Sequence, residues 1–163
     1  MSNEADLVRD IIDANVFMTL STADATGHPW VSPVYFATED YVDFYWISAP
    51  DAAHSVNLAE RPQLSIVIFN SQLRPNQARA QAVYLAAEAV QVTGADFDRG
   101  LQVYPGPPAR GARVFAADEL REPGPFRLYR ARATQHWILC PRPVGDPCVP
   151  HGKAHDHRLA VTL

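Results

Sequence analysis

The stretch VFMTLSTADATGHPWVSPVYFAT, residues 16–38, decides what fold to expect. β-branched and aromatic residues favour extended backbone on both sides of DATGHP, which is typical of a turn because it combines aspartate, glycine and proline. A second turn at Glu39 and Asp40 precedes YVDFYWIS, residues 41–48. The pattern predicts three consecutive antiparallel strands that form a meander.

Three helices are expected around these strands. Asn3 can cap a helix whose apolar positions recur at helical spacing, which predicts an N-terminal helix over residues 3–15. The segment APDAAHSVNLAER, residues 49–61, predicts a second helix with Pro50 in its first turn. A short third helix is expected over residues 96–104.

The rest of the chain supplies further strands. QLSIVIFN (63–70), QAVYLAAEAVQVTG (81–94) and the alternating FRLYRARATQHWIL (126–139) bring the expected number to six. A proline-rich tail with a last strand in RLAVTL is expected over residues 141–163. Many short strands without βαβ alternation predict a mainly β (α+β) fold, a single small barrel domain over residues 1–163 with helical plugs.

Charge and composition exclude several partners. The chain has 163 residues, a formal net charge of -4 and a pI near 5.8, so it carries no excess of positive charge for nucleic acid. Its acidic N-terminus does not resemble a signal peptide, and no apolar run reaches the roughly 18 residues of a membrane span. We expect a cytoplasmic protein with no nucleic-acid or membrane partner.

Motifs that carry chemistry are few. The sequence contains no GxGxxG, GxxxxGK[ST], HExxH or GxSxG. Cys148, His151, His155 and His157 are spaced C-x2-H-x3-H-x-H, which is not a recognised structural zinc pattern. This spacing favours a solvated polar tail and no metal site, and Cys140 and Cys148 are expected to be reduced thiols.

The chain resembles the FMN-binding split barrels related to pyridoxamine 5'-phosphate oxidase. The resemblance covers residues 8–95, with a weaker echo in HWIL and HDHR near the C-terminus. It rests on the order and spacing of MTLSTADATGHPWVSPVYF, FYWIS, NLAERP, LSIVIF and QAVYLAAEA. It implies a six-stranded antiparallel split β-barrel of Greek-key type, working as a homodimer with FMN at the subunit interface. The implied activity is a flavin-dependent oxidoreductase acting on a small molecule, with no single catalytic residue indicated.

The resemblance also implies which residues contact the cofactor. Trp30, Val31, Ser32 and Pro33 would follow the ring and ribityl chain, and Ile47 and Ser48 would offer hydrogen bonds. His54 stands where the family usually has a phosphate-binding lysine, so it is a phosphate contact, an exposed helix residue or a catalytic group. Gln81, Trp137 and Arg158 would approach the flavin ring.

Two alternatives remain open at this point. One is the deazaflavin coenzyme F-420, whose anionic tail would need a basic groove; the arginines that could line it, or form a solvated strand face, are Arg110, Arg113, Arg127, Arg130 and Arg132. The other is a non-enzymatic flavin- or haem-binding protein on the same barrel, although the sequence offers no clear axial ligand for haem.

Overall fold

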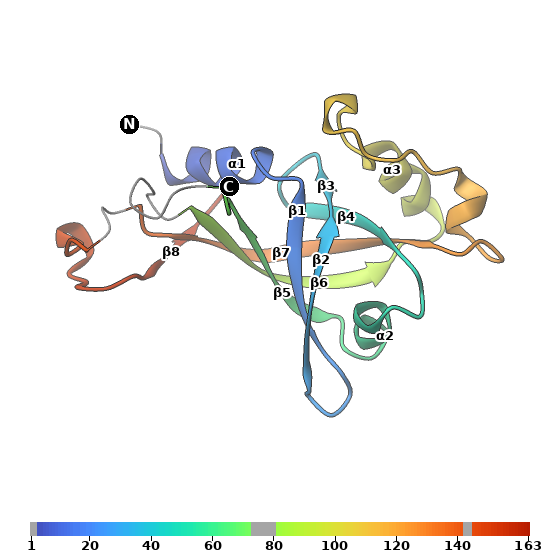
Figure 1. Cartoon of the computed structure of the whole chain (residues 1–163), viewed down its shortest axis with the longest axis horizontal. Helices are drawn as coiled ribbons and strands as arrows, with labels where there is room; N and C mark the ends of the chain where they lie inside the picture. Colours follow the sequence, from blue (N-terminus) through green and yellow to red (C-terminus); the bar gives the residue numbers. More distant parts are fainter. Residues whose placement is uncertain (1–2, 73–80, 142–144) are drawn as a thin grey trace.

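The computed structural model describes residues 3–72, 81–141 and 145–163, which form one curled antiparallel sheet surrounded by short helices (Figure 1). The strands are β1 (Phe17–Ala23), β2 (Pro29–Tyr35), β3 (Ala37–Thr38), β4 (Asp43–Ser48), β5 (Gln63–Phe69), β6 (Ala82–Gln91), β7 (Arg127–Leu139) and β8 (Arg158–Val161). The α-helices are α1 (Glu4–Asp13), α2 (Ala53–Glu60) and α3 (Ala95–Val103). No helix in these ranges combines the length and the apolar character needed to cross a bilayer.

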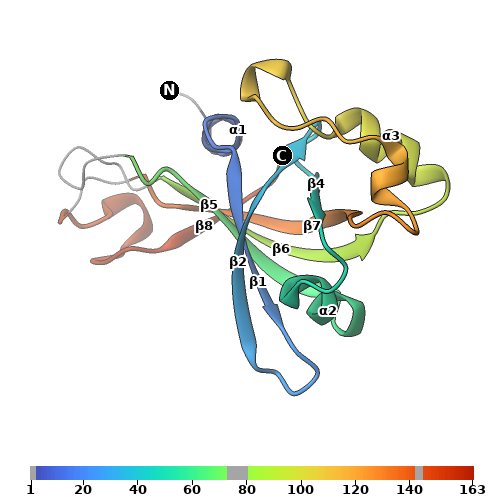
Figure 2. The ribbon, with the colours of Figure 1, turned by 45° about the vertical axis from the view of Figure 1, so that its right-hand side comes forward.

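The sheet is an antiparallel half-barrel, which confirms the predicted fold class. Neighbouring strands follow the order β2-β1-β5-β6-β7-β4-β3, and β8 pairs with the far end of β7. The described residues form eight strands: the six expected barrel strands, the last strand expected in RLAVTL, which is β8, and the short additional strand β3. β2 contacts β4, so the two ends of the path approach each other and the sheet curls into a barrel with a seam between them (Figure 2).

The predicted meander over residues 16–48 is wrong at its second strand. Phe36 is fully buried, and its N–H donates to the carbonyl of Val16, which extends the pairing with the β1 segment by one residue. The segment before Phe36 pairs with β1, while Ala37 and Thr38 pair with β4. β4 then pairs with β7 on its other side, so β2 and β4 face each other across the seam instead of sharing a ladder.

Alternation along the strands builds the core. Leu64, Ile66 and Ile68 of β5 point inward with Leu20 of β1, and the intervening residues of β5 face outward. Helix α1 lies across one end of the barrel and adds three apolar side chains to the same cluster (Figure 1). The predicted N-cap is confirmed, because the side chain of Asn3 accepts a hydrogen bond of 2.9 Å from the N–H of Asp6.

β4 is buried on both faces, and the second face accounts for α3. Phe44 and Trp46 point into the barrel, whereas Tyr45 packs in a second cluster with Phe97 of α3. α3 approaches closely through Gly100, where an added Cβ would lie 2.8 Å from Leu128 Cδ2. This double burial explains why FYWIS is apolar without alternation.

Ile66→Ala should lower the free energy of unfolding by about 2–5 kcal/mol, because it leaves a cavity at a position that is 1% exposed. Gln63→Ala, on the same strand and exposed, should change it by less than about 0.5 kcal/mol. Urea unfolding of both variants at one protein concentration measures the difference. Equal effects would contradict the assignment of the two faces.

Candidate functional site

A buried histidine bridges the seam between β2 and β4. His54, in the first turn of α2, is 8% exposed and lies between two serine hydroxyls. Its Nδ1 is 3.1 Å from Ser32 Oγ on β2, and its Nε2 is 2.8 Å from Ser48 Oγ at the end of β4. Trp30 Nε1 donates to the same Ser32 oxygen over 3.0 Å. The two strand edges are thus joined through a side-chain network.

One consistent set of donors and acceptors satisfies all three contacts. Ser32 Oγ accepts from the Trp30 indole, so its own hydroxyl is available to donate to His54 Nδ1. A neutral imidazole then carries its proton on Nε2 and donates to Ser48 Oγ. Burial lowers the pKa of His54 below its usual 6.5, which favours this neutral form.

The structure corrects the position of the second helix. α2 begins at Ala53, with Ala52 as an N-cap that makes no side-chain capping bond, and not at Pro50 as predicted. The alternative that His54 is an exposed helix residue is wrong, since its side chain is buried. Contact between His54 and a phosphate stays a prediction, and both ring nitrogens already have hydroxyl partners.

A cavity of about 640 Å³ lies on the outer face of the sheet. Strand alternation supplies its floor: Ser21 pairs with both Val31 and Ser65, and Tyr84 pairs with both Val67 and Trp137. The lining residues are Thr19, Ser21, Val31, Ser65, Ile66, Val67, Tyr84, Leu85, Trp137 and Arg158. The surface is therefore mostly apolar, with hydroxyl groups along one side.

Arg158 is the cation of this cavity. It is the first residue of β8, and its guanidinium carbon lies 4.1 Å from the centroid of the Tyr84 ring. Tyr84 is the cross-strand neighbour of Trp137, whose own partner on the other side is Ala160 of β8. β8 thus places a charge beside two aromatic side chains.

The predicted cofactor residues fall into two groups. Trp30, Ser32, Ser48 and His54 belong to the seam network, whereas Val31, Trp137 and Arg158 line the outer cavity. Pro33 shares the exposed outer face of β2 with Val31 by alternation.

Two predicted residues lie in neither group. Ile47 packs against the cluster under α3, and Gln81 stands immediately before β6.

Sequence reasoning missed the hydroxyl and aromatic part of the cavity, formed by Thr19, Ser21, Ser65 and Tyr84. The residue types at the outward-facing positions of β1, β5 and β6 could have identified these four residues from the sequence. The polar residues at these positions alternate with core residues on strands that pair side by side.

The arginines considered for a deazaflavin groove are engaged within the chain. Arg132 binds both carboxylate oxygens of Asp43, at 3.0 and 2.8 Å, and Arg130 contacts Asp43 and Asp96. Arg127 is buried and pairs with Glu122. The remaining two are also occupied: Arg110 donates to the Asn15 carbonyl and Arg113 pairs with Glu119. These five side chains do not form a shared basic groove.

The curled antiparallel sheet with its seam defines the chain as a split β-barrel. The family model for pyridoxamine 5'-phosphate oxidase matches residues 5–140, and the chain belongs to this family. Comparison of the sequence with curated proteins gives no match.

Several solved structures share the fold. A heme binding protein from Mycobacterium smegmatis is 18% identical with a TM-score of 0.69, covering 98% of this chain and 59% of that protein. HutZ, a heme storage protein from Vibrio cholerae, is 22% identical with a TM-score of 0.64, covering 85% of this chain and 95% of that one. ChuZ from Campylobacter jejuni is 14% identical with a TM-score of 0.65, covering 85% of this chain and 57% of that one. The chain thus spans little more than half the length of two of these proteins.

His54→Gln should lower the free energy of unfolding by about 1–3 kcal/mol at neutral pH, because it disrupts a buried hydrogen-bond bridge. Because the pKa of His54 is lowered on folding, the unfolded chain binds more protons below pH about 6.5. The native protein therefore loses stability as the pH falls through 6.5 toward the folded pKa, and the stability gap to the variant should shrink there. Urea unfolding between neutral and acid pH measures this slope.

The matched control is His28→Gln, since His28 is exposed. It should keep the acid-side slope of the wild-type protein. If His54→Gln keeps that slope as well, His54 is not the group whose protonation weakens the barrel.

Proposed function

We propose that the protein is a cytoplasmic, homodimeric flavin-dependent oxidoreductase that holds FMN against the outer cavity and acts on a small organic molecule. The observation that carries this proposal is the grouping of Trp137, Tyr84 and Arg158 beside the hydroxyls of β1 and β5. Family membership supports the proposal, because the family model is named after pyridoxamine 5'-phosphate oxidase, which is a flavin enzyme.

The cavity has the size and lining that a planar, phosphorylated ligand needs. Its volume of about 640 Å³ falls within the roughly 300–1,000 Å³ of small-molecule sites. Aromatic and aliphatic side chains suit the faces of an isoalloxazine ring, and the hydroxyls of Thr19, Ser21 and Ser65 suit a ribityl chain. Arg158 can form charge-assisted hydrogen bonds with a phosphate or with the ring carbonyls.

Bound FMN would supply hydride transfer, and the side chains of the protein would bind and orient the cofactor and exclude water. Trp137 and Tyr84 would orient a ring by packing on it. Arg158 would hold negative charge beside the cavity, and Val31 and Val67 would exclude water. No acid-base pair is required of the protein, which agrees with the lack of an obvious catalytic motif in its sequence.

Dimerisation would bring the two groups of predicted residues to one ligand. The seam group and the cavity group lie on opposite faces of β2, because Ser32 and Val31 are adjacent residues of that strand. The outer face is rich in exposed apolar side chains: Phe17 and Val31 are each 58% exposed and Phe69 is 49% exposed. A second subunit would cover this surface and set its own seam residues against the cavity.

Haem binding is the second candidate. It is favoured by the heme binding protein of M. smegmatis and the heme storage protein HutZ, which share the fold. Among the residues that line the cavity none is a histidine, cysteine or methionine, and the phenol of Tyr84 is the side chain that could ligate iron.

Freshly purified protein should be yellow and release FMN. Arg158→Ala should weaken FMN binding about ten- to hundredfold, because it removes a charge-assisted contact. Arg99→Ala, which removes an exposed arginine paired with Glu39, should leave the affinity unchanged. Fluorescence titration of the apoprotein with FMN gives both values.

A haem chromophore in place of flavin would overturn the FMN proposal. In that event Tyr84→Phe should change the Soret band, because it removes the oxygen that could bind iron. An apoprotein that binds neither FMN nor haem would contradict both candidates.

Val31→Glu should convert the dimer into a monomer, because it places a charge on an apolar surface that we expect to be covered. Val114→Glu is the matched control, since Val114 is 74% exposed and lies outside the sheet. Size-exclusion chromatography with light scattering gives the masses. A wild-type monomer that still binds FMN tightly would rule out the shared site.

A further inference from the structure

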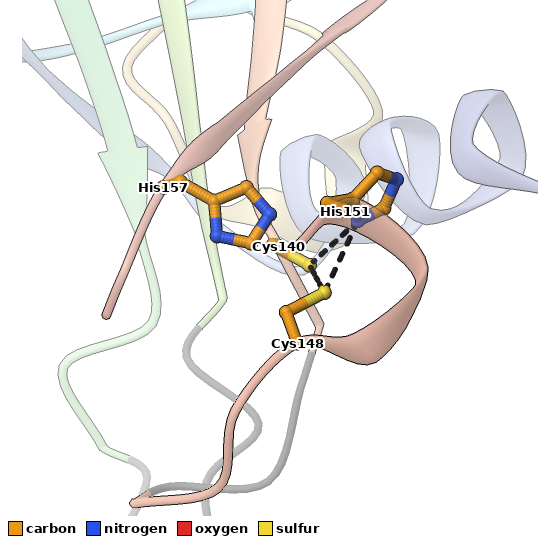
Figure 3. Close-up of side chains that lie close together, drawn as sticks. All are labelled: Cys140, Cys148, His151 and His157. Carbon is orange, nitrogen blue, oxygen red and sulfur yellow. Dashed lines mark hydrogen bonds between the residues drawn. The ribbon is translucent and has the colours of Figure 1, made fainter. Parts of the chain in front are cut away.

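The C-terminal tail brings two cysteines and two histidines together at one point (Figure 3). Cys140 follows the end of β7, Cys148 and His151 lie in a turn, and His157 precedes β8. Each side chain offers one ligand atom, and all four atoms lie within 4.8 Å of one another. Cys140 and Cys148 are 6% and 5% exposed, so two sulfurs are buried here.

The spacing between these atoms is close to that of a tetrahedral metal site. Zinc–sulfur bonds of about 2.3 Å and zinc–nitrogen bonds of about 2.05 Å separate tetrahedral ligands by roughly 3.8 Å for two sulfurs and roughly 3.6 Å for sulfur and nitrogen. The two Sγ atoms are 3.6 Å apart, and His151 Nδ1 lies 3.8 Å from Cys140 Sγ and 3.1 Å from Cys148 Sγ. A disulfide bond would need about 2.05 Å between the sulfurs.

The hydrogen bond of His157 selects the tautomer that a metal ligand needs. Its Nδ1 lies 3.1 Å from the carbonyl oxygen of His155, and a carbonyl can only accept a hydrogen bond. The proton of a neutral ring is therefore on Nδ1, which leaves a lone pair on Nε2. Nε2 is buried and has no hydrogen-bond partner among the described residues. A carbonyl that orients the ring through its other nitrogen is the usual support of a metal-bound histidine.

We propose that Cys140, Cys148, His151 and His157 bind a zinc ion that has a structural role. Two thiolates and two imidazoles in tetrahedral arrangement favour zinc over magnesium or calcium, which prefer oxygen ligands. Two thiolates balance the charge of the ion, so the cluster becomes neutral and the two buried sulfurs carry no net charge with it. Four protein ligands fill the coordination sphere and leave no position for substrate, as in structural sites.

The tail pattern from which no metal site was predicted did not include Cys140. The structure leaves out the side chain of His155, which is exposed, and brings in Cys140 from the end of β7. The ligand spacing is therefore C-x7-C-x2-H-x5-H. The local backbone supports this arrangement, because Cys148 bridges to Lys153 and Gly152 adopts the left-handed conformation that closes the turn. The Cys140 N–H also donates to the carbonyl of His157 over 2.9 Å.

The zinc would fix β8 to the end of β7. β8 has only four residues and starts at Arg158, directly after the ligand His157. Loss of the metal should therefore loosen the strand that carries Arg158 into the outer cavity. The metal assignment itself does not depend on which ligand occupies that cavity.

The test uses the full-length chain without a histidine tag, produced in zinc-supplemented medium under reducing conditions. After gel filtration, elemental analysis should find one zinc per chain. Replacement of zinc by cobalt(II) should give the intense visible bands of a tetrahedral site and a thiolate-to-metal charge-transfer band. Metal content well below one per chain after zinc reconstitution, or a cobalt spectrum without thiolate charge transfer, would overturn the proposal.

Variants then separate the ligands from their neighbour. Cys148→Ser and His157→Ala should each weaken zinc binding by more than roughly 100-fold, since outer-shell changes alone cost about 10–100-fold. His155→Ala is the matched control, because it keeps the backbone carbonyl and removes a tail histidine outside the cluster, and its zinc affinity should stay within about twofold of the wild type. Equal loss in His155→Ala, or a Cys140–Cys148 disulfide found by mass spectrometry in the zinc-reconstituted protein, would refute the ligand set.

Discussion

The barrel depends on the imidazole of His54, which joins two strand edges that have no ladder to hold them at this point. Ser32 belongs to β2 and Ser48 to β4, the strands that meet across the seam, and the two ring nitrogens of His54 reach one hydroxyl each. α2 is held in place by a second buried contact, in which Asn57 Nδ2 donates to Thr22 Oγ1 of β1. Buried polar groups are stabilising only when they are satisfied, so each partner in this network constrains the next. The seam is consequently a defined structural element and not merely an unpaired edge.

Local patterns predicted the parts of this fold that local physics determines. The strand β5, the apolar stripe of α1 and the Asn3 cap all appear where the sequence predicted them. Strand pairing was harder to predict, because VSPVYFAT reads as one extended segment, whereas it pairs with β1 before Phe36 and with β4 after it. The burial of His54 was equally hidden, since it arises from two serines that are 22 and 6 positions away in the chain.

The candidate ligand site was also hard to predict, because it is formed by residues that are far apart in the sequence. Val31, Trp137 and Arg158 line one cavity although β1, β5 and β6 lie between β2 and β7 in the sheet, an arrangement that no short motif encodes. Resemblance identified these three residues, but it also identified Ser32, which lies on the other face of β2, and His54 of α2, which contacts Ser32 there. Adjacent residues of one strand cannot both face the same side of a sheet. A ligand that contacted both sets would have to reach around the edge strand or be shared by two subunits, and the exposed apolar outer face favours the second arrangement in the proposed dimer.

β8 is short, and the cluster of Cys140, Cys148, His151 and His157 lies where this strand needs additional stabilisation. Four residues paired to one neighbour form a weak strand, because the ladder ends before many cooperative contacts accumulate. Most of the residues from Gly145 to Arg158 are exposed and bury little apolar surface against the barrel. In the proposed metal site, one ion joins the end of β7, the turn at Cys148 and the residue before β8, and so replaces the hydrophobic contacts that this segment lacks. Because Arg158 directly follows His157, a metal bound to His157 would also fix the position of Arg158. Loss of that metal would then let the positive charge beside the cavity move.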